Sequence, residues 1–593
     1  MSDSNLAEAK VVVGLDFGTT FSGYAFAHTS KPNEILTFYD WPRPMKPYCK
    51  TLTAVYYEPG DGAVAQLKSW GFPALHEFTK DINNLQKMRA KSAVDLPEVG
   101  TYLVRFKLHL ASKDSGESSA TKLPKGFTVT NVIADYLREI GASIMRHLRT
   151  KYNDDLTMES VQWCVTVPSI WDDHAKKQME VCMARAGLIG SAQSAGGSPH
   201  PLSIVLEPEA ASCYCHRNMP DLHLVKGDRL LVADIGGGTT DIVVQEWISE
   251  TPDDYRVKEV TYSTGGLCGG TYVDEQFNRF LFSKIQCLPR FLRKSSAFMA
   301  EIFKRWEEIK CSFGDMVTVG ESFEIQLPSK LASDWEDYDS EQGNPPRPSY
   351  DELELTHTDI KEIFDPVVEQ NLALIADQLS RTSNVKVIFV VGGFAGSPYL
   401  LSKIKERFIG AVEKVISPVQ PGSAVCQGAV MLALNPDGIT SRVARKTYGF
   451  EVCRDFRTGD PDELEYISWV GEDKKCEACF SSFVKKGDLL EVDHCVSKEF
   501  SPLHPGAKNL KFVLYSSGEM DPKYTRGPGA ESKEEASFQV DISAGAHVEG
   551  RPIVKVSMYF GRSAIEVKAI GQNFGNGEVH GCQLPVEFRG DWI

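Results

Sequence analysis

Apolar residues follow two patterns along this chain: short continuous runs and longer stretches with helical spacing. Three runs each end in a turn of small residues: VVVGLDFGTT from Val11, LLVADIGGGTTD from Leu230 and VKVIFVVGGFAG from Val385. Each run predicts a buried strand that leads into a loop. Helical spacing predicts helices over residues 129–148, 174–186, 273–282 and 360–379. The alternation predicts an α/β fold with ligand-binding loops at strand ends.

The first two turns share one wording, an aspartate followed by glycines and then two threonines. This repetition in distant parts of the chain predicts two related halves that face each other across a cleft. We expect a short tail over 1–10, a first lobe over 11–225, a second lobe over 226–445 and a C-terminal module over 446–593. Residues 112–126, 191–201 and 331–350 are interpreted as flexible surface insertions.

The C-terminal region alternates apolar and polar residues, which is typical of strands. IVKVSMYF from Ile553 and SAIEVKAI from Ser563 predict a β-hairpin, and LKFVLY from Leu510 predicts a further strand. A β-rich module is therefore expected. Two interpretations stay open: an exposed edge of the hairpin could accept an extended segment, or the module could be a closed structural sandwich.

Composition changes this picture little. A chain of 593 residues with 42% apolar and 24% charged residues is an ordinary globular protein with several packing units. Its net charge of -16 argues against a nucleic-acid partner. No secretory signal and no membrane-spanning run stands out, so we expect a cytoplasmic protein, with the nucleus as the other compartment.

Fourteen cysteines are scattered over the chain, which predicts reduced thiols and no disulfide framework. Cys476 and Cys479, with His494 and Cys495 nearby, resemble a zinc site in spacing. A turn with two incidental thiols is the alternative.

The two glycine-threonine turns have the chemistry that a bound triphosphate needs. Glycines let backbone amides approach phosphate oxygens, and hydroxyls at Thr19, Thr20 and Thr239 add donors. Asp16 and Asp234 offer the oxygen ligands that magnesium prefers, directly or through water. The P-loop and dinucleotide patterns are both missing from the sequence. The turns therefore predict ATP with magnesium as the ligand.

At this point the chain resembles the heat-shock protein 70 family, which has a two-lobed, actin-like (ribonuclease H-like duplicated) ATPase domain. The resemblance covers residues 11–433 and rests on motifs in the family's order. These motifs are DFGTTFSG, VTVPSIWDDHAKKQ from Val165, LEPEAAS from Leu206, DIGGGTTD, STGGLCGGTYVD from Ser263 and VGGFAGSP from Val391. VGGFAGSP, SRVARKTYGF from Ser441 and the final β segment look like the divergent twelfth subgroup of that family.

The resemblance implies a role for each matching residue. It places Asp16, Asp234 and Asp241 around magnesium, partly through water, and it implies catalytic roles for Lys107, Glu207, Asp234 and Thr239. Lys107 would steady the γ-phosphate and the attacking water, although an exposed strand lysine is the alternative. The implied nucleotide contacts are Gly18, Thr19, Thr20, Phe21, Gly236, Gly237, Gly238, Gly269, Gly270, Glu307, Lys310, Gly392 and Gly393.

The sequence also departs from the family's pattern. Cys311 and Gly396 stand where two arginines would sandwich adenine, so we expect weaker or altered recognition of the base. ARKTYGFEV stands where the family has its interdomain linker, and with the last residue at Ile593 we expect no helical lid.

These features predict a chaperone-like, weak ATPase that couples its nucleotide state to a C-terminal interaction module and contributes to protein folding. Protein clients or cochaperones are the expected partners, and the chain is expected to be a monomer or weak oligomer. A small-molecule kinase of the same superfamily and a nucleotide-binding scaffold with negligible turnover are the alternatives. Filament formation is a remote one, because fold alone does not confer function.

Overall fold

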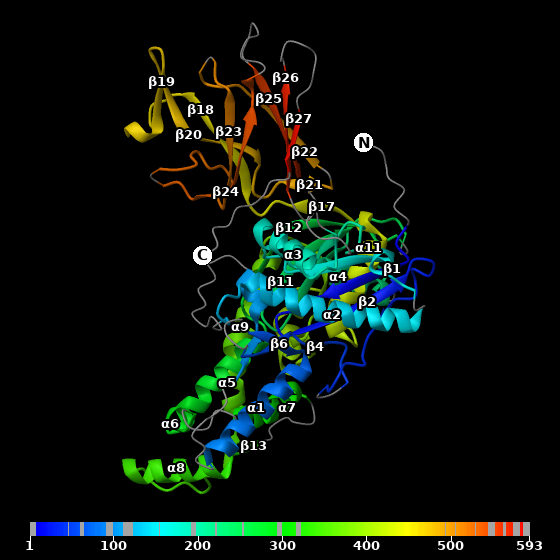
Figure 1. The fold of residues 1–593 in the computed structure, drawn as a ribbon, viewed down its shortest axis with the longest axis vertical. Coiled ribbons are helices and arrows are strands. Elements are labelled where there is room, and N and C mark those ends of the chain that lie inside the picture. Colours follow the sequence, from blue (N-terminus) through cyan, green and yellow to red (C-terminus); the bar gives the residue numbers. More distant parts are fainter. Residues whose placement is uncertain are drawn as a thin grey trace.

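Two large sheets form the body of the protein, and a β-rich module sits at one end of it (Figure 1). The computed structural model describes residues 8–44, 47–59, 65–90, 99–110, 123–152, 155–190, 197–219, 222–251, 254–292, 299–315, 322–492, 494–504, 506–527, 529–543, 552–560, 565–572 and 581–584.

The first sheet begins with an antiparallel hairpin and continues with parallel strands. Its order is β3 (Leu36–Thr37), β2 (Phe21–His28), β1 (Val11–Asp16), β8 (Val161–Val167) and β9 (Ser203–Leu206), and β4 (Thr51–Leu52) also pairs with β2. Strand β1 runs antiparallel to β2 and parallel to β8. Every residue of β1 is buried, which agrees with the run of apolar residues that precedes Asp16 at its end.

The second sheet repeats this arrangement. Its order is β16 (Lys414–Ile416), β15 (Val385–Val391), β10 (Arg229–Ile235), β11 (Thr240–Trp247), β12 (Val257–Gly266), β17 (Ile439–Val443) and β21 (Leu489–Glu491). As in the first sheet, one strand, β10, is antiparallel to its hairpin partner and parallel to the strand on its other side. The two sheets thus share a topology, as expected of two related halves, and each hairpin turn is one of the two glycine-threonine turns.

Two smaller sheets extend the lobes. One consists of β6 (Gln66–Trp70), β5 (Ala54–Glu58) and β7 (Thr101–Val104), and the other of β13 (Phe323–Gln326) and β14 (Glu352–Leu355). Strand β7 is followed by a single 3₁₀ segment, η1 (Phe106–Leu110), which carries Lys107.

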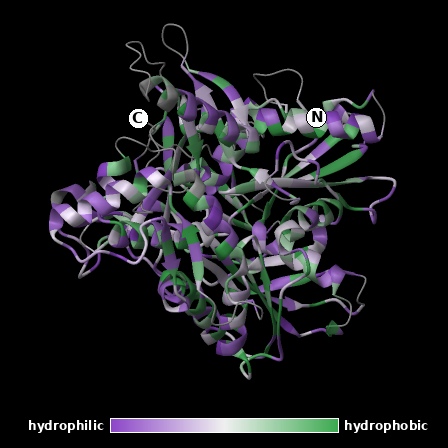
Figure 2. Cartoon of the chain, turned by 90° about the horizontal axis from the view of Figure 1, so that it is seen from below, coloured by the Kyte–Doolittle hydropathy of each residue, from purple (hydrophilic) through white to green (hydrophobic). Residues whose placement is uncertain are grey.

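Helices cover both faces of the large sheets, and the four predicted helices are all present. They are α2 (Val129–Lys151), α3 (Asp173–Arg185), α5 (Gly270–Lys284) and α9 (His357–Ser380). The others are α1 (Phe72–Ala90), α4 (Glu207–Asn218), α6 (Leu288–Leu292), α7 (Met299–Ser312), α8 (Ser329–Gln342), α10 (Pro398–Phe408) and α11 (Ala424–Leu434). Figure 2 shows interior strands largely in green and peripheral helices with more purple, as expected when helices shield the sheets from water. The α/β class is confirmed.

Two sheets that share one hydrophobic core make up the C-terminal module. The first has the order β19 (Ile467–Val470), β20 (Asp473–Val484), β18 (Thr447–Asp455), β23 (Asn509–Ser517) and β24 (Ser532–Asp541); the second has β22 (His494–Phe500), β25 (Ile553–Phe560), β26 (Glu566–Gln572) and β27 (Gly581–Leu584). Phe450 and Leu514 of the first sheet and Val556 of the second belong to the same buried cluster. The expected β-rich region is therefore confirmed, and its sheets pack as a sandwich.

The hairpin predicted from IVKVSMYF forms as β25 and β26, and of the two open interpretations the one with an exposed hairpin edge is wrong. Strand β25 also pairs with β22, and β26 also pairs with β27. The hairpin therefore occupies the middle of its sheet. Pattern alone could not show this, because the periodicity of a strand does not reveal its neighbours.

Residues 331–350 are not the flexible insertion that their acidity and paired prolines suggested. Helix α8 spans most of this segment and buries Leu331 and Trp335 in the core of the second lobe. Beyond the helix, Arg347 returns to form an ion pair with Asp339 at 2.7 Å and to lie over the Trp335 ring at 4.5 Å. In Figure 1, α8 lies at the end of the molecule opposite to the C-terminal module. Most of the other two expected insertions, 112–126 and 191–201, lie outside the described residues.

Among the helices that the structure describes, none is long and apolar enough to cross a membrane.

Helix α11 joins the two lobes at very close range. A Cβ atom added at its Gly428 would lie 1.7 Å from the carbonyl oxygen of Ala210 on α4. We therefore expect Gly428→Val to lower the free energy of unfolding by roughly 1–3 kcal/mol through overpacking, measured by thermal or denaturant unfolding. Gly396→Ala is the matched control, because a Cβ atom there would meet nothing within 4 Å. Equal stabilities of the two variants would contradict the close approach.

Candidate functional site

The two glycine-threonine turns lie against each other between the lobes. A Cβ atom added at Gly237 would stand 2.2 Å from Thr20 Oγ1, and one added at Gly238 would stand 2.7 Å from Thr19 Oγ1. Both distances are shorter than a Cβ atom normally makes, so any other residue at these places would displace the threonine side chains. The predicted residues of the two turns are therefore brought together.

Further loops pack on the second turn. The backbone amides of Gly269 and Gly270 donate to the carbonyl oxygens of Gly238 and Gly236. On the other side, Gly392 has a φ of 94°, which favours glycine, and a Cβ atom there would lie 2.4 Å from the carboxylate of Asp234. The loops expected to hold the nucleotide thus converge on one place.

Four buried carboxylates and two buried lysines surround these turns. Lys107 Nζ lies 2.6 Å from Glu207 Oε1, and Lys50 Nζ lies 2.5 Å from Asp16 Oδ2. Asp234 and Asp241 are the other two carboxylates, and both are buried. Lys107 is only 2% exposed and lies on η1, so the alternative of an exposed strand lysine is wrong.

The carboxylates influence one another electrostatically. Burial raises the pKa of Glu207 to about 7; Lys107 opposes this shift, and Asp241 and Asp16 add to it. Burial and the neighbouring Glu207, Asp16 and Asp241 raise the pKa of Asp234 well above its usual range. With four carboxylates and two ammonium groups, the fully ionised cluster would carry two excess negative charges. Burying this excess charge is costly, and for this reason Glu207 and Asp234 hold their protons to a higher pH than usual.

The cluster fits a nucleotide with a divalent cation on two observations. Its excess negative charge would be balanced by a divalent ion. In addition, the buried Thr20 Oγ1 has no hydrogen-bond partner among the described residues, so it is free to donate to a ligand in the turn. No group of three or more His, Cys, Asp or Glu side chains placed to ligate a metal ion directly was found in the described part of the chain.

The same finding bears on the zinc site considered for the C-terminal module. Cys476 and Cys479 are both buried in β20, and they form no such ligand group with His494 or Cys495 in the part of the chain that the structure describes.

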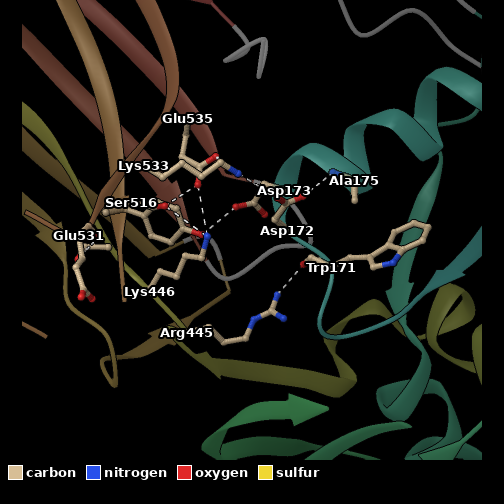
Figure 3. Close-up of polar contacts among 12 residues, drawn as sticks. Trp171, Asp172, Asp173, Ala175, Arg445, Lys446, Ser516, Glu531, Lys533 and Glu535 are labelled. Carbon is tan, nitrogen blue, oxygen red and sulfur yellow. Dashed lines mark hydrogen bonds and ion pairs between the residues drawn. The ribbon is translucent and has the colours of Figure 1, made fainter. Parts of the chain in front are cut away.

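The segment between β8 and α3 connects this cluster to the C-terminal module. At one end, Ser169 Oγ and the Ile170 amide donate to Asp241 Oδ1 at 2.8 and 3.1 Å. At the other end, Arg445, the residue directly before the module, donates to the carbonyl oxygen of Trp171 at 3.2 Å. Figure 3 shows this second end, where side chains from α3 and from the module meet.

Two further contacts fasten the start of α3 to the module. Tyr448 donates to Asp173 at 3.2 Å, and Lys533 forms an ion pair with Asp172 at 3.5 Å (Figure 3). Glu535 accepts from Ser516 at 2.6 Å and pairs with Lys533 and Lys446 behind them. One short segment therefore touches both the carboxylate cluster and the module.

The residues expected at the base end of the site lie on α7 and the loop before α10. Lys310 pairs with Glu307 at 2.6 Å and with Asp274 of α5 at 2.8 Å. The Tyr399 amide donates to the carbonyl of Phe313, which joins α10 to the end of α7. Gly396 has open space around it, so packing does not force a glycine at this position. Phe21 and Gly393 both lie near Tyr48. Phe21 packs edge-on against the Tyr48 ring, and a Cβ atom at Gly393 would lie 3.8 Å from the Tyr48 hydroxyl.

Sequence reasoning missed Lys50 and Ser169. Lys50 lies in PYCKTLT, where nothing distinguishes it from a surface lysine. Ser169 lies inside the segment VTVPSIWDD, but its hydroxyl gains meaning only when Asp241 from the other lobe is placed beside it. The predicted Asp16 and Asp241 were the nearest signals, since a buried carboxylate needs partners.

Comparison with known proteins agrees with this geometry. The family model described as Hsp70 protein matches residues 123–442. Heat shock 70 kDa protein 12A of Homo sapiens is 25% identical over 96% of this chain and 91% of its own length, and the human protein 12B is 26% identical over 95% and 89%. Chaperone protein DnaK of Thermoplasma volcanium is 24% identical over 71% of this chain and 57% of its own. The likeness to 12A and 12B includes the C-terminal module, as the sequence predicted.

The raised pKa of Glu207 predicts a pH dependence of stability without metal or nucleotide. The folded chain holds this proton more tightly than the unfolded chain, so stability is lost as the pH rises from the ordinary 4.5 of glutamate to about 7. Glu207→Gln should remove this loss and gain roughly 1–3 kcal/mol relative to the native chain between pH 5 and pH 8. Unfolding curves in EDTA across this range test it.

Glu250→Gln serves as the control for that experiment, because the Glu250 side chain is 75% exposed. The control should leave the pH profile of the native chain unchanged. A Glu207→Gln profile parallel to that of the native chain would show that Glu207 ionises normally.

Proposed function

This chain belongs to the Hsp70 family and contains the family's nucleotide-binding ATPase domain, and from that premise we propose that it binds ATP with magnesium between its lobes and hydrolyses it slowly. The single observation that carries the proposal is the buried cluster of Asp16, Glu207, Asp234 and Asp241 against the paired glycine turns. The energetic cost of its excess negative charge is relieved by a bound divalent cation.

The chain's own residues would divide the work as follows. Backbone amides of Gly237 and Gly238 and the hydroxyls of Thr19, Thr20 and Thr239 would hold the phosphates, while the Gly236 amide donates to the Thr239 carbonyl and shapes the turn. Asp16, Asp234 and Asp241 would hold the waters of the magnesium ion, which supplies charge neutralisation at the transferring phosphoryl group. Lys107 and Glu207, which already share a hydrogen bond, would orient the attacking water.

Lys107 provides the direct test of this proposal. Lys107→Ala should lower the single-turnover rate of ATP hydrolysis by about 10²-fold or more, because positioning and charge stabilisation supply most of the catalysis in phosphoryl transfer. Lys31→Ala is the matched control, since the Lys31 side chain is 64% exposed. Equal, background-level rates for the native chain and for Lys107→Ala would reject the ATPase and leave the scaffold alternative.

The proposal includes coupling between the nucleotide and the C-terminal module. Removal of the γ-phosphate changes how two lobes are held together, and a segment that touches both the site and another module can transmit that change. Residues 169–173 are such a segment, because Ser169 and Ile170 bind Asp241 while Asp172 and Asp173 contact the module. Protein clients or cochaperones in the cytoplasm are proposed as the module's partners. Strands β25 and β26 are each paired on both sides, which argues against the addition of an extended client segment to either of them.

Arg445→Ala should weaken this coupling. In the native chain we expect limited proteolysis of the module to differ between Mg-ATP and Mg-ADP, and we expect that difference to shrink in Arg445→Ala, which loses the hydrogen bond to Trp171. Nucleotide affinity should stay within about threefold, because Arg445 does not contact the cluster. Arg526→Ala, which breaks an ion pair inside the module, is the control. An undiminished difference in Arg445→Ala would contradict coupling through this contact.

The small-molecule kinase is not favoured. The family match and the relatives that cover most of the chain point to chaperone-type ATPases. Phosphorylation of a sugar by the purified chain would overturn this preference. For the oligomeric state we propose a monomer or weak oligomer, which sedimentation in the presence of ATP would test.

A further inference from the structure

Arg105 has an unusual backbone conformation beside the candidate site. It lies between β7 and η1, two residues before Lys107, and its φ is 61°. Few residues other than glycine adopt this left-handed region, because the Cβ atom crowds the backbone. The arginine is held in place by its surroundings, and such strain gathers at functional sites.

The Arg105 side chain crosses from the first lobe to the second. Its Nη1 lies 2.6 Å from Glu275 Oε1, and its guanidinium lies over the ring of Tyr272 at 5.6 Å. Both partners belong to α5. This helix begins at Gly270, in the loop that packs on the second glycine-threonine turn. Thr271, the residue before Tyr272, donates its amide and its hydroxyl to the carbonyl of Gly237. The guanidinium therefore lies against the first turns of α5, and α5 is itself hydrogen-bonded to the glycine turn through Thr271.

Two of the three guanidinium nitrogens find no partner in the part of the chain that the structure describes. Nε and Nη2 of Arg105 are buried and donate no hydrogen bond among the described residues. Buried N–H groups without acceptors are costly, and those of an arginine form a planar fork that suits phosphate oxygens. The ion pair with Glu275 does not explain the arrangement, since the two side chains are 27% and 38% exposed and pairs near the surface contribute little.

We propose that Arg105 is a further phosphate-binding residue, whose Nε and Nη2 donate to oxygens of the terminal phosphate of ATP while Nη1 stays on Glu275. Arg105 thereby reads the presence of the γ-phosphate and connects it directly to α5 of the second lobe. This role rests on the proposed nucleotide function, and it assigns to the chain a second cation beside Lys107 for the same phosphate.

The test measures two affinities of the full chain by isothermal titration calorimetry. One is for the magnesium complex of a non-hydrolysable β,γ-imido analogue of ATP, and the other is for Mg-ADP. Arg105→Ala should weaken binding of the analogue about tenfold or more and that of ADP by less than about twofold, because only the analogue has a γ-phosphate. Arg105→Lys should lose a similar amount, since an ammonium group cannot form the planar fork. It also serves as the second variant if the alanine protein does not fold.

Glu275→Gln is the matched control. Its amide oxygen can still accept from Nη1, so the affinity for the analogue should fall by less than about threefold. If Arg105→Ala and Glu275→Gln each lose as much affinity for ADP as for the analogue, Arg105 acts only through its ion pair between the lobes, and the proposal is overturned. Unchanged affinities in Arg105→Ala would overturn it as well. If the native chain binds neither ligand, the proposed nucleotide function itself fails, which is a distinct outcome.

Discussion

The structure depends on the burial of four carboxylates with only two lysines beside them. Asp16, Glu207, Asp234 and Asp241 come from both lobes, and each lies at the end of a strand or at the start of a helix or hairpin strand. Charges of one sign are unstable in an interior that excludes water, so the cluster is tolerable only where a ligand or a proton compensates it. The fold brings these groups together despite that cost, and the two sheets with their shared topology are the means of doing so.

Glycines stand where the two halves approach each other around this cluster. A side chain at Gly237 or Gly238 would displace Thr20 or Thr19, and one at Gly392 would crowd Asp234. Small residues allow the two halves to bring their turns into one site, and the packing of α11 on α4 through Gly428 holds the halves at that distance. The proposed phosphate end of the site is thus closely packed, with a glycine at each of these contacts.

Around the residues expected at the base end, the packing is looser at Gly396. Gly396 is surrounded by open space, so its lack of a side chain reflects no packing requirement. Lys310 is engaged with Glu307 and Asp274, which leaves the base end built from carboxylates and one lysine. In the opposite direction, residues 169–173 connect Asp241 to the sandwich, and β21 from within the C-terminal region pairs with β17 at the edge of the second large sheet.

The sequence by itself determined the strands that end in the glycine turns and four of the helices, because these depend on local periodicity. It also indicated Asp16 and Asp234 from the repeated turn, and Glu207 and Asp241 from the motifs that resemble the family's. Only the tertiary structure decided that Lys50 partners Asp16, that Ser169 binds Asp241 and that Arg105 reaches Glu275. It also decided that α8 packs on the core and that β25 and β26 lie inside their sheet. Such pairings join residues far apart in the chain, and no local pattern encodes which distant group will satisfy a buried charge or an open strand edge.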